Sequence, residues 1–170
     1  MSRSLRFRCV AACLMLLTPA LLGAGGEPLR APGITSQQWL NSEPISSQAL
    51  RGKVVLVEFW TFGCRNCKNV EPHIQQWHRR YKDAGLVVIG VHTPEFVYER
   101  NPDNLRDYVA EHEILYPVAV DNDARVWQAF HNWAWPSIYL IGKQGKIRYR
   151  RIGEGGYQET ERTIRILLDE

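Results

Sequence analysis

Cysteine is scarce in this 170-residue sequence, which contains only four. Two of them, Cys9 and Cys13, lie in an apolar N-terminal segment, which leaves Cys64 and Cys67 for the rest of the chain. A bridge across so short a spacing closes a very small loop and removes little entropy from the unfolded chain. The sequence therefore excludes a disulfide-rich scaffold, and stability is a poor reason for this pair.

The sequence also lacks a surplus of charge of one sign once its first 26 residues are set aside. The whole chain has 21 basic and 18 acidic residues, but the N-terminal segment holds three of the basic residues and none of the acidic ones. The remainder is near neutral, which argues against a nucleic-acid-binding surface. Internal repeats and low-complexity segments are missing too, so the length fits one globular domain with an N-terminal extension.

Residues 1–26 have the layout of a secretory signal peptide, with three arginines, an apolar run and then small residues. The small residues form no clean A-x-A peptidase site, so an uncleaved N-terminal anchor is the alternative. In either case we expect export to the periplasm or another extracytoplasmic compartment. Residues 27–44 are predicted to form an irregular lead-in, and residues 45–170 the folded domain, with a short strand or turn near residues 45–50.

Strand-like and helical patterns alternate along the domain and predict an α/β fold. Residues 54–60 and 86–92 are apolar runs of the kind found in strands buried on both faces. A helix is predicted between them, over residues 66–81, and this βαβ order favours parallel strands with a right-handed crossover. The other predicted elements are a helix from Pro102, a strand over 116–120, a short helix over 124–131, a hairpin over 137–150 and a helix from Tyr157.

Cys64 and Cys67 stand where the first predicted strand gives way to a helix. Free backbone N–H groups and the helix dipole at that point favour a thiolate at Cys64. Arg65 places a positive charge beside it, which is expected to lower the pKa of Cys64 further. Spacing alone is compatible with a redox couple, half of a zinc site or a structural bridge.

The order of elements, together with the cysteine pair, resembles the thioredoxin fold. Thioredoxins carry an acid six residues before the first cysteine, followed by an aromatic pair, and a proline five residues after the second cysteine. Glu58, Phe59-Trp60 and Pro72 stand at those places. Thioredoxins also have a cis-proline before the hairpin strand, which is the place of Pro136. The resemblance implies a central mixed sheet with helices on both faces.

The stretch from Thr93 to Asn132 is longer than a plain thioredoxin requires and supplies an extra strand and helix, which resembles the TlpA-like branch. Residues 91–96, 116–122, 135–141 and 153–157 are most similar to the periplasmic thioredoxin-like domain of DipZ-type proteins. Those proteins are often fused to an electron-transporting membrane domain.

The resemblance gives these residues expected roles. Cys64 is expected to be the nucleophile and Cys67 the thiol that resolves the mixed disulfide. Glu58 lies in an apolar strand, so we expect a raised pKa and a role as acceptor of the Cys67 proton; pairing with a Lys or Arg is the alternative. A cis Trp135–Pro136 bond is expected to hold the Trp135 backbone open for a substrate peptide, and a trans proline at a strand start is the alternative.

Phe62, Arg65 and Trp135 complete the predicted substrate-binding residues around the cysteines. His92 and Glu95 follow a predicted strand near the same edge of the sheet. We interpret both as solvated loop residues rather than as groups that tune the thiols.

These residues together predict an exported thiol–disulfide oxidoreductase that works more readily as a reductant, in redox homeostasis or cytochrome c biogenesis. Its expected partners are protein disulfides or thiols and a membrane electron donor. We expect a monomer without cofactor, metal or nucleic acid.

Two other functions remain open at this stage. Thr61, three residues before Cys64, partly matches the arrangement of a thiol peroxidase, in which Cys64 attacks a peroxide. A copper- or partner-binding module is the other, with His73, His78 and His92 as possible additional ligands.

Overall fold

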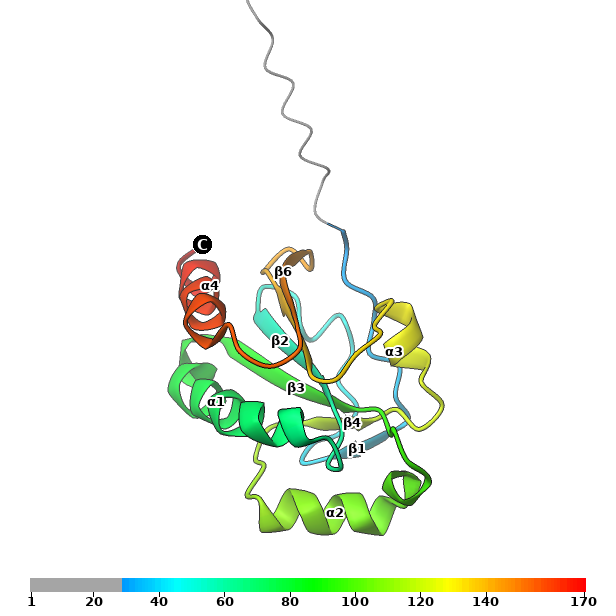
Figure 1. Cartoon of the computed structure of the whole chain (residues 1–170). Coiled ribbons are helices and arrows are strands. Elements are labelled where there is room, and N and C mark those ends of the chain that lie inside the picture. The colour runs from blue at the N-terminus through cyan, green and yellow to red at the C-terminus, as the bar shows by residue number, and fades with distance from the viewer. Residues whose placement is uncertain (1–28) are drawn as a thin grey trace, which may run out of the picture.

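The computed structural model describes residues 29–170, in which one mixed sheet is covered by helices on both faces (Figure 1). The predicted signal peptide or anchor lies outside these residues, as do Cys9 and Cys13. None of the helices in the described part of the chain is both long and apolar enough to cross a membrane.

Six strands form the sheet in the order β1-β4-β3-β2-β5-β6. Strands β2, β3 and β4 are parallel, whereas β1, β5 and β6 pair antiparallel with their neighbours. The strands are β1 (Gln38–Leu40), β2 (Val54–Trp60), β3 (Leu86–His92), β4 (Val118–Val120), β5 (Ser137–Ile141) and β6 (Ile147–Ile152).

Helices α1 and α4 pack on one face of the sheet and α3 packs on the other, while α2 lies beyond the β4–β1 edge (Figure 1). The helices are α1 (Arg65–Tyr81), η1 (Lys82–Ala84), η2 (Val97–Arg100), α2 (Pro102–Glu111), α3 (Arg125–Ala129) and α4 (Tyr157–Asp169). The thioredoxin-like arrangement and its inserted helix and strand, α2 and β4, therefore match the predicted fold class.

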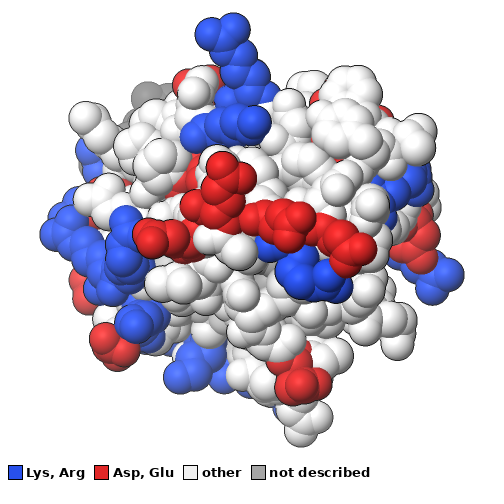
Figure 2. Space-filling view, turned by 90° about the horizontal axis from the view of Figure 1, so that it is seen from below, with Lys and Arg blue, Asp and Glu red and all other residues white. Residues whose placement is uncertain are grey.

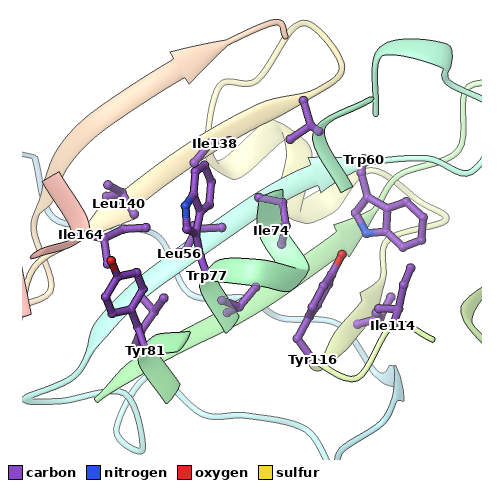
Figure 3. Close-up of a cluster of buried hydrophobic side chains, with 14 of the residues drawn as sticks. Leu56, Trp60, Ile74, Trp77, Tyr81, Ile114, Tyr116, Ile138, Leu140 and Ile164 are labelled. Carbon is purple, nitrogen blue, oxygen red and sulfur yellow. The ribbon is translucent and has the colours of Figure 1, made fainter. Parts of the chain in front are cut away.

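Strand β2 is buried along its whole length, and its alternate side chains enter two separate cores. Leu56 and Trp60 belong to the core beneath α1, whereas Val57 and Phe59 belong to the core beneath α3. Figure 3 shows the first core, where Leu56 lies near Trp77 and Trp60 lies toward the end that contains Tyr116. By the same alternation Glu58 falls on the α1 face.

The N-terminal lead-in differs from the sequence prediction. Residues 27–44 were expected to be irregular, but β1 lies within them and pairs with β4, with Gln38 opposite Val120. A three-residue edge strand is too short to produce a periodic pattern. Residues 45–50 form a turn rather than a strand, closed by the Ala49 N–H donating to the Ser46 carbonyl at 3.0 Å.

Candidate active site

Cys64 is the N-cap residue of α1, four residues after β2 ends. Its sulfur accepts a hydrogen bond from the Cys67 backbone N–H at 3.2 Å. Cys67 lies in the first turn of the helix and is 3% exposed, whereas Cys64 is half-buried. Both are free thiols in this structure. The outer sulfur is thus accessible to a partner, and the inner one is covered.

Hydrogen bonds to the Cys64 sulfur lower the pKa of Cys64 to about 7. The Cys67 thiol contributes most, and the backbone N–H groups of Cys67 and Asn66 add to it, against the opposing effect of burial. The same contact with Cys64, together with burial, raises the pKa of Cys67. The expected influence of Arg65 is not among the main causes, because the sulfur gains more from donors that point directly at it.

Glu58 is 1% exposed and lies on the α1 face of β2. Burial raises the pKa of its carboxyl to about 8, and the negative charges of Glu71 and Cys64 add to the rise. Tyr116 opposes it, since its hydroxyl donates to Glu58 Oε2 at 3.5 Å. Glu58 in turn raises the pKa of Cys67, which places the two groups within electrostatic reach of each other.

A second acid, Glu71, is bound by a side chain of the inserted helix α2 and by the C-cap residue of that helix. The Tyr108 hydroxyl donates to Glu71 Oε2 at 2.9 Å, and His112 Nδ1 lies 3.0 Å from Glu71 Oε1. Sequence reasoning missed this cluster because its members come from two helices whose packing no motif predicts. Glu71 matters here because its charge raises the pKa of Glu58.

The Trp135–Pro136 peptide bond is cis, as the resemblance predicted. Pro136 is buried, and Trp135 is partly exposed with its indole ring 4.3 Å from that of Trp127. The Trp135 indole N–H donates to the Thr93 carbonyl at 3.0 Å, which ties the cis-proline loop to the segment after β3.

His92 does not lie in a solvated loop, contrary to the sequence interpretation. It is the last residue of β3 and is fully buried, with Nε2 3.2 Å from Thr61 Oγ1 and its ring stacked on Phe62. Burial lowers its pKa to about 4, so the imidazole is neutral at pH 7. The prediction was wrong because β3 runs to its end between β2 and β4. Glu95 is exposed, as expected, but its charge raises the pKa of Cys64, so it does affect the thiol.

Glu99 is the residue near the cysteines that sequence reasoning overlooked. Its buried carboxylate accepts three backbone N–H groups, from Gly63 at 2.8 Å, Glu95 at 2.6 Å and Phe96 at 2.8 Å. A Cβ on residue 63 would lie 2.1 Å from Glu99 Oε1, which explains the glycine before Cys64. The one available signal was an acid at the third position of a short helix, where it can cap its own N-terminus.

The described residues contain no group of three or more His, Cys, Asp or Glu side chains placed to hold a metal ion. His73 stacks on Tyr157 with ring centroids 3.7 Å apart, and His78 lies against Tyr116.

The sequence matches the AhpC/TSA family over residues 29–150, which is most of the chain. The chain belongs to this family. Protein DipZ of Mycobacterium tuberculosis is 45% identical over 141 residues, which cover 81% of this chain but 20% of DipZ. This chain therefore spans about a fifth of the length of that relative.

Two further proteins are similar over nearly their whole length. Thiol-disulfide oxidoreductase YkuV of Bacillus subtilis is 31% identical and covers 82% of this chain and 94% of its own. The crystal structure of a thioredoxin-like superfamily protein matches with a TM-score of 0.77 and 29% identity, over 83% of this chain and 97% of its own. These relatives confirm the predicted thioredoxin fold, and YkuV bears the name of the predicted class, thiol–disulfide oxidoreductase.

The pKa of Cys64 provides a first test of this geometry. Cys67→Ala removes the thiol that contributes most to lowering it, so the pKa is expected to rise from about 7 toward its ordinary value of 9.0. The rate of alkylation by iodoacetamide as a function of pH measures the midpoint, because the thiolate is the reactive form. Arg65→Gln is the matched control and should leave the midpoint nearly unchanged; equal shifts in both variants would contradict the account.

The raised pKa of Glu58 predicts a pH-dependent loss of stability. Between its ordinary value of 4.5 and about 8, folded Glu58 keeps a proton that the unfolded chain has released, so stability falls as pH rises through this window. Glu58→Gln removes that loss, which at about 1.4 kcal/mol per pKa unit is on the order of 4 kcal/mol. Guanidinium unfolding of both reduced proteins at pH 5 and pH 9 measures it. A stability difference between variant and parent that does not change with pH would refute the prediction.

Proposed function

We propose that this chain reduces disulfides in extracytoplasmic proteins, by exchange through a mixed disulfide at Cys64. The observation that carries the proposal is the contrast between two neighbouring thiols. Cys64 is half-buried and has a pKa of about 7, whereas Cys67 is covered and has a raised pKa. A value near 7 is typical of thioredoxin, whereas strongly oxidising relatives of the same fold have values near about 3.5. Such oxidants are strong because their reduced form is so well stabilised.

The first step is attack by the Cys64 thiolate on one sulfur of a substrate disulfide. A new S–S bond joins Cys64 to the substrate, and the substrate's other sulfur leaves as a thiolate that takes a proton from solvent. Arg65 is exposed, Phe62 and Trp135 are partly exposed, and all three are proposed to contact the substrate. The Trp135 backbone before cis Pro136 is proposed to pair with the substrate chain.

In the second step Cys67 attacks the Cys64 sulfur and releases the second substrate thiolate. Cys67 must first lose its proton, and its raised pKa makes a nearby acceptor necessary. We assign that role to the Glu58 carboxylate. The products are a Cys64–Cys67 disulfide and a substrate dithiol, so two electrons pass from this chain to the substrate.

Each turnover leaves the chain oxidised, so an external dithiol must reduce it. We propose a membrane electron donor for this role, as the resemblance to DipZ-type proteins implies; the matched segment makes up 20% of DipZ. We further propose that residues 1–26 direct export or anchor the chain, and that the exchange serves redox homeostasis or cytochrome c biogenesis outside the cytoplasm.

The direction of electron flow is tested by the reduction potential of the Cys64–Cys67 pair. Equilibration with glutathione buffers is expected to give a value near that of thioredoxin, about −270 mV, and the protein should catalyse reduction of insulin by dithiothreitol. A potential near −120 mV would identify an oxidant instead. Rapid hydrogen peroxide consumption without disulfide reduction would favour the peroxidase alternative.

The role of Glu58 is tested with 5,5′-dithiobis(2-nitrobenzoate), which releases one thionitrobenzoate at each step. Glu58→Gln should leave the first release, by Cys64, at the parent rate and slow the second, by Cys67, about 100-fold. Stopped-flow absorbance resolves the two phases. Glu111→Gln, on the exposed side of α2, is the control and should match the parent. An unchanged second phase in Glu58→Gln would remove Glu58 from the mechanism.

A further inference from the structure

Three consecutive apolar side chains stand exposed next to the cysteines. Phe96 is 50% exposed, Val97 is 84% exposed and Tyr98 is 52% exposed. They make up three of the seven large hydrophobic residues that are exposed in the described part of the chain. Isolated exposed apolar residues are ordinary, but a contiguous group marks an interaction site. We refer to residues 96–98 as the apolar segment.

The apolar segment is fixed to the active site at both ends. Before it, the Trp135 indole donates to the Thr93 carbonyl; after it, buried Glu99 accepts N–H groups from Gly63, Glu95 and Phe96. The segment's own rings are ordered as well, since Phe96 and Tyr98 are stacked with an interplanar angle of 9°. Apolar groups that are already held in place lose little conformational freedom on binding.

The segment also contacts the loop that leads to the reactive sulfur of Cys64. The Tyr98 ring contacts Phe62 with centroids 5.7 Å apart, and Glu99 binds the N–H of Gly63, the residue before Cys64. The charge of Glu95 also acts on Cys64 and raises its pKa. Any chain whose disulfide meets Cys64 therefore passes close to the segment.

Charge around the segment selects among the possible occupants. Figure 2 shows acidic side chains in a row across the face seen from below, where α2 lies in Figure 1. Helix α2 begins four residues after Tyr98 and carries exposed Asp103, Asp107 and Glu111 at four-residue spacing, which places them on one side of the helix. Exposed Arg100 and Arg106, which pairs with Asp103, offset part of this charge. Four exposed acids still leave the surroundings of the segment negative, which disfavours anionic lipid headgroups and makes a membrane surface a poor occupant. These acids are Glu95, Asp103, Asp107 and Glu111.

We propose that the apolar segment docks the side chains that flank the cysteine of a polypeptide substrate, and so favours disulfides with apolar neighbours. The inference rests on the proposed reductase function, since the substrate is a protein disulfide. It goes beyond that function, because thiol–disulfide exchange alone does not require a preference for disulfides with apolar neighbours.

The test compares three substrates of the full chain. Two are peptides with one internal disulfide, flanked by Phe and Leu or by Ser and Gly, and the third is bis(2-hydroxyethyl) disulfide. The double variant Phe96→Ser/Val97→Ser should lower kcat/KM about tenfold for the apolar peptide and leave the other two unchanged. Ile166→Ser, at another exposed apolar position on α4, is the matched control. Equal losses on all three substrates, or no loss on the apolar peptide, would overturn the proposal.

Binding separates this inference from the function on which it rests. Calorimetry with Cys64→Ser/Cys67→Ser, which performs no exchange, should show tighter binding of the apolar peptide, lost when Phe96→Ser/Val97→Ser is added. Failure of the parent protein to reduce bis(2-hydroxyethyl) disulfide would count against the reductase function and leave this measurement intact. In the same background Glu99→Gln, which weakens the anchor without altering the apolar side chains, should also weaken that binding.

Two further measurements address other occupants. Sedimentation that shows a dimer of the parent chain, dissociated by Phe96→Ser/Val97→Ser, would assign the segment to contact between copies and overturn the proposal. Cosedimentation of the parent with phosphatidylglycerol vesicles, lost in the same variant, would assign it to a lipid surface and overturn it equally. The expected result is a monomer that does not bind the vesicles.

Discussion

Burial of β2 on both faces is the constraint on which the site depends. Because α1 and α3 cover opposite sides of this strand, every side chain on it enters a core, including that of Glu58. Burial raises the pKa of this acid to about 8, because it disfavours the charged form, and the hydrogen bond from Tyr116 only limits the rise. The same packing fixes where β2 ends, and so where Cys64 begins α1. One strand thereby sets both the position of the outer sulfur and the state of the acid behind the inner one.

Glu99 holds the loop that contains the apolar segment in place beside the cysteines. A loop with three exposed apolar residues would ordinarily be mobile, but one buried carboxylate satisfies three of the backbone N–H groups around it. The arrangement requires residue 63 to lack a side chain, because a Cβ there would occupy the place of the carboxylate. Gly63 therefore serves the packing of the neighbouring loop rather than a turn of its own, and its φ is not in the left-handed region.

Features that depend on a local pattern could be predicted from the sequence. Features that depend on packing between distant segments could not. Apolar runs located β2 and β3, and spacing placed Cys64 at the start of α1. The Trp135–Pro136 cis bond followed from resemblance. Strand β1 was missed because it is three residues long and pairs with β4, about 80 residues later. His92 was misjudged because its burial depends on the strands to either side. Glu99 escaped notice since its partners include an N–H 36 residues earlier.

Glu58 and Glu71 together set the basicity of the proposed proton acceptor for Cys67. Cys67 has a raised pKa, so an acceptor with the ordinary carboxyl value of about 4.5 would be far too weak a base for it. Burial and the charge of Glu71 strengthen Glu58 as a base, while the hydrogen bond from Tyr116 limits the rise. Glu71 is bound by Tyr108 of α2 and by His112, the C-cap residue of that helix. In the proposed mechanism the inserted helix therefore acts through Glu71, whose charge raises the pKa of Glu58, the proposed acceptor.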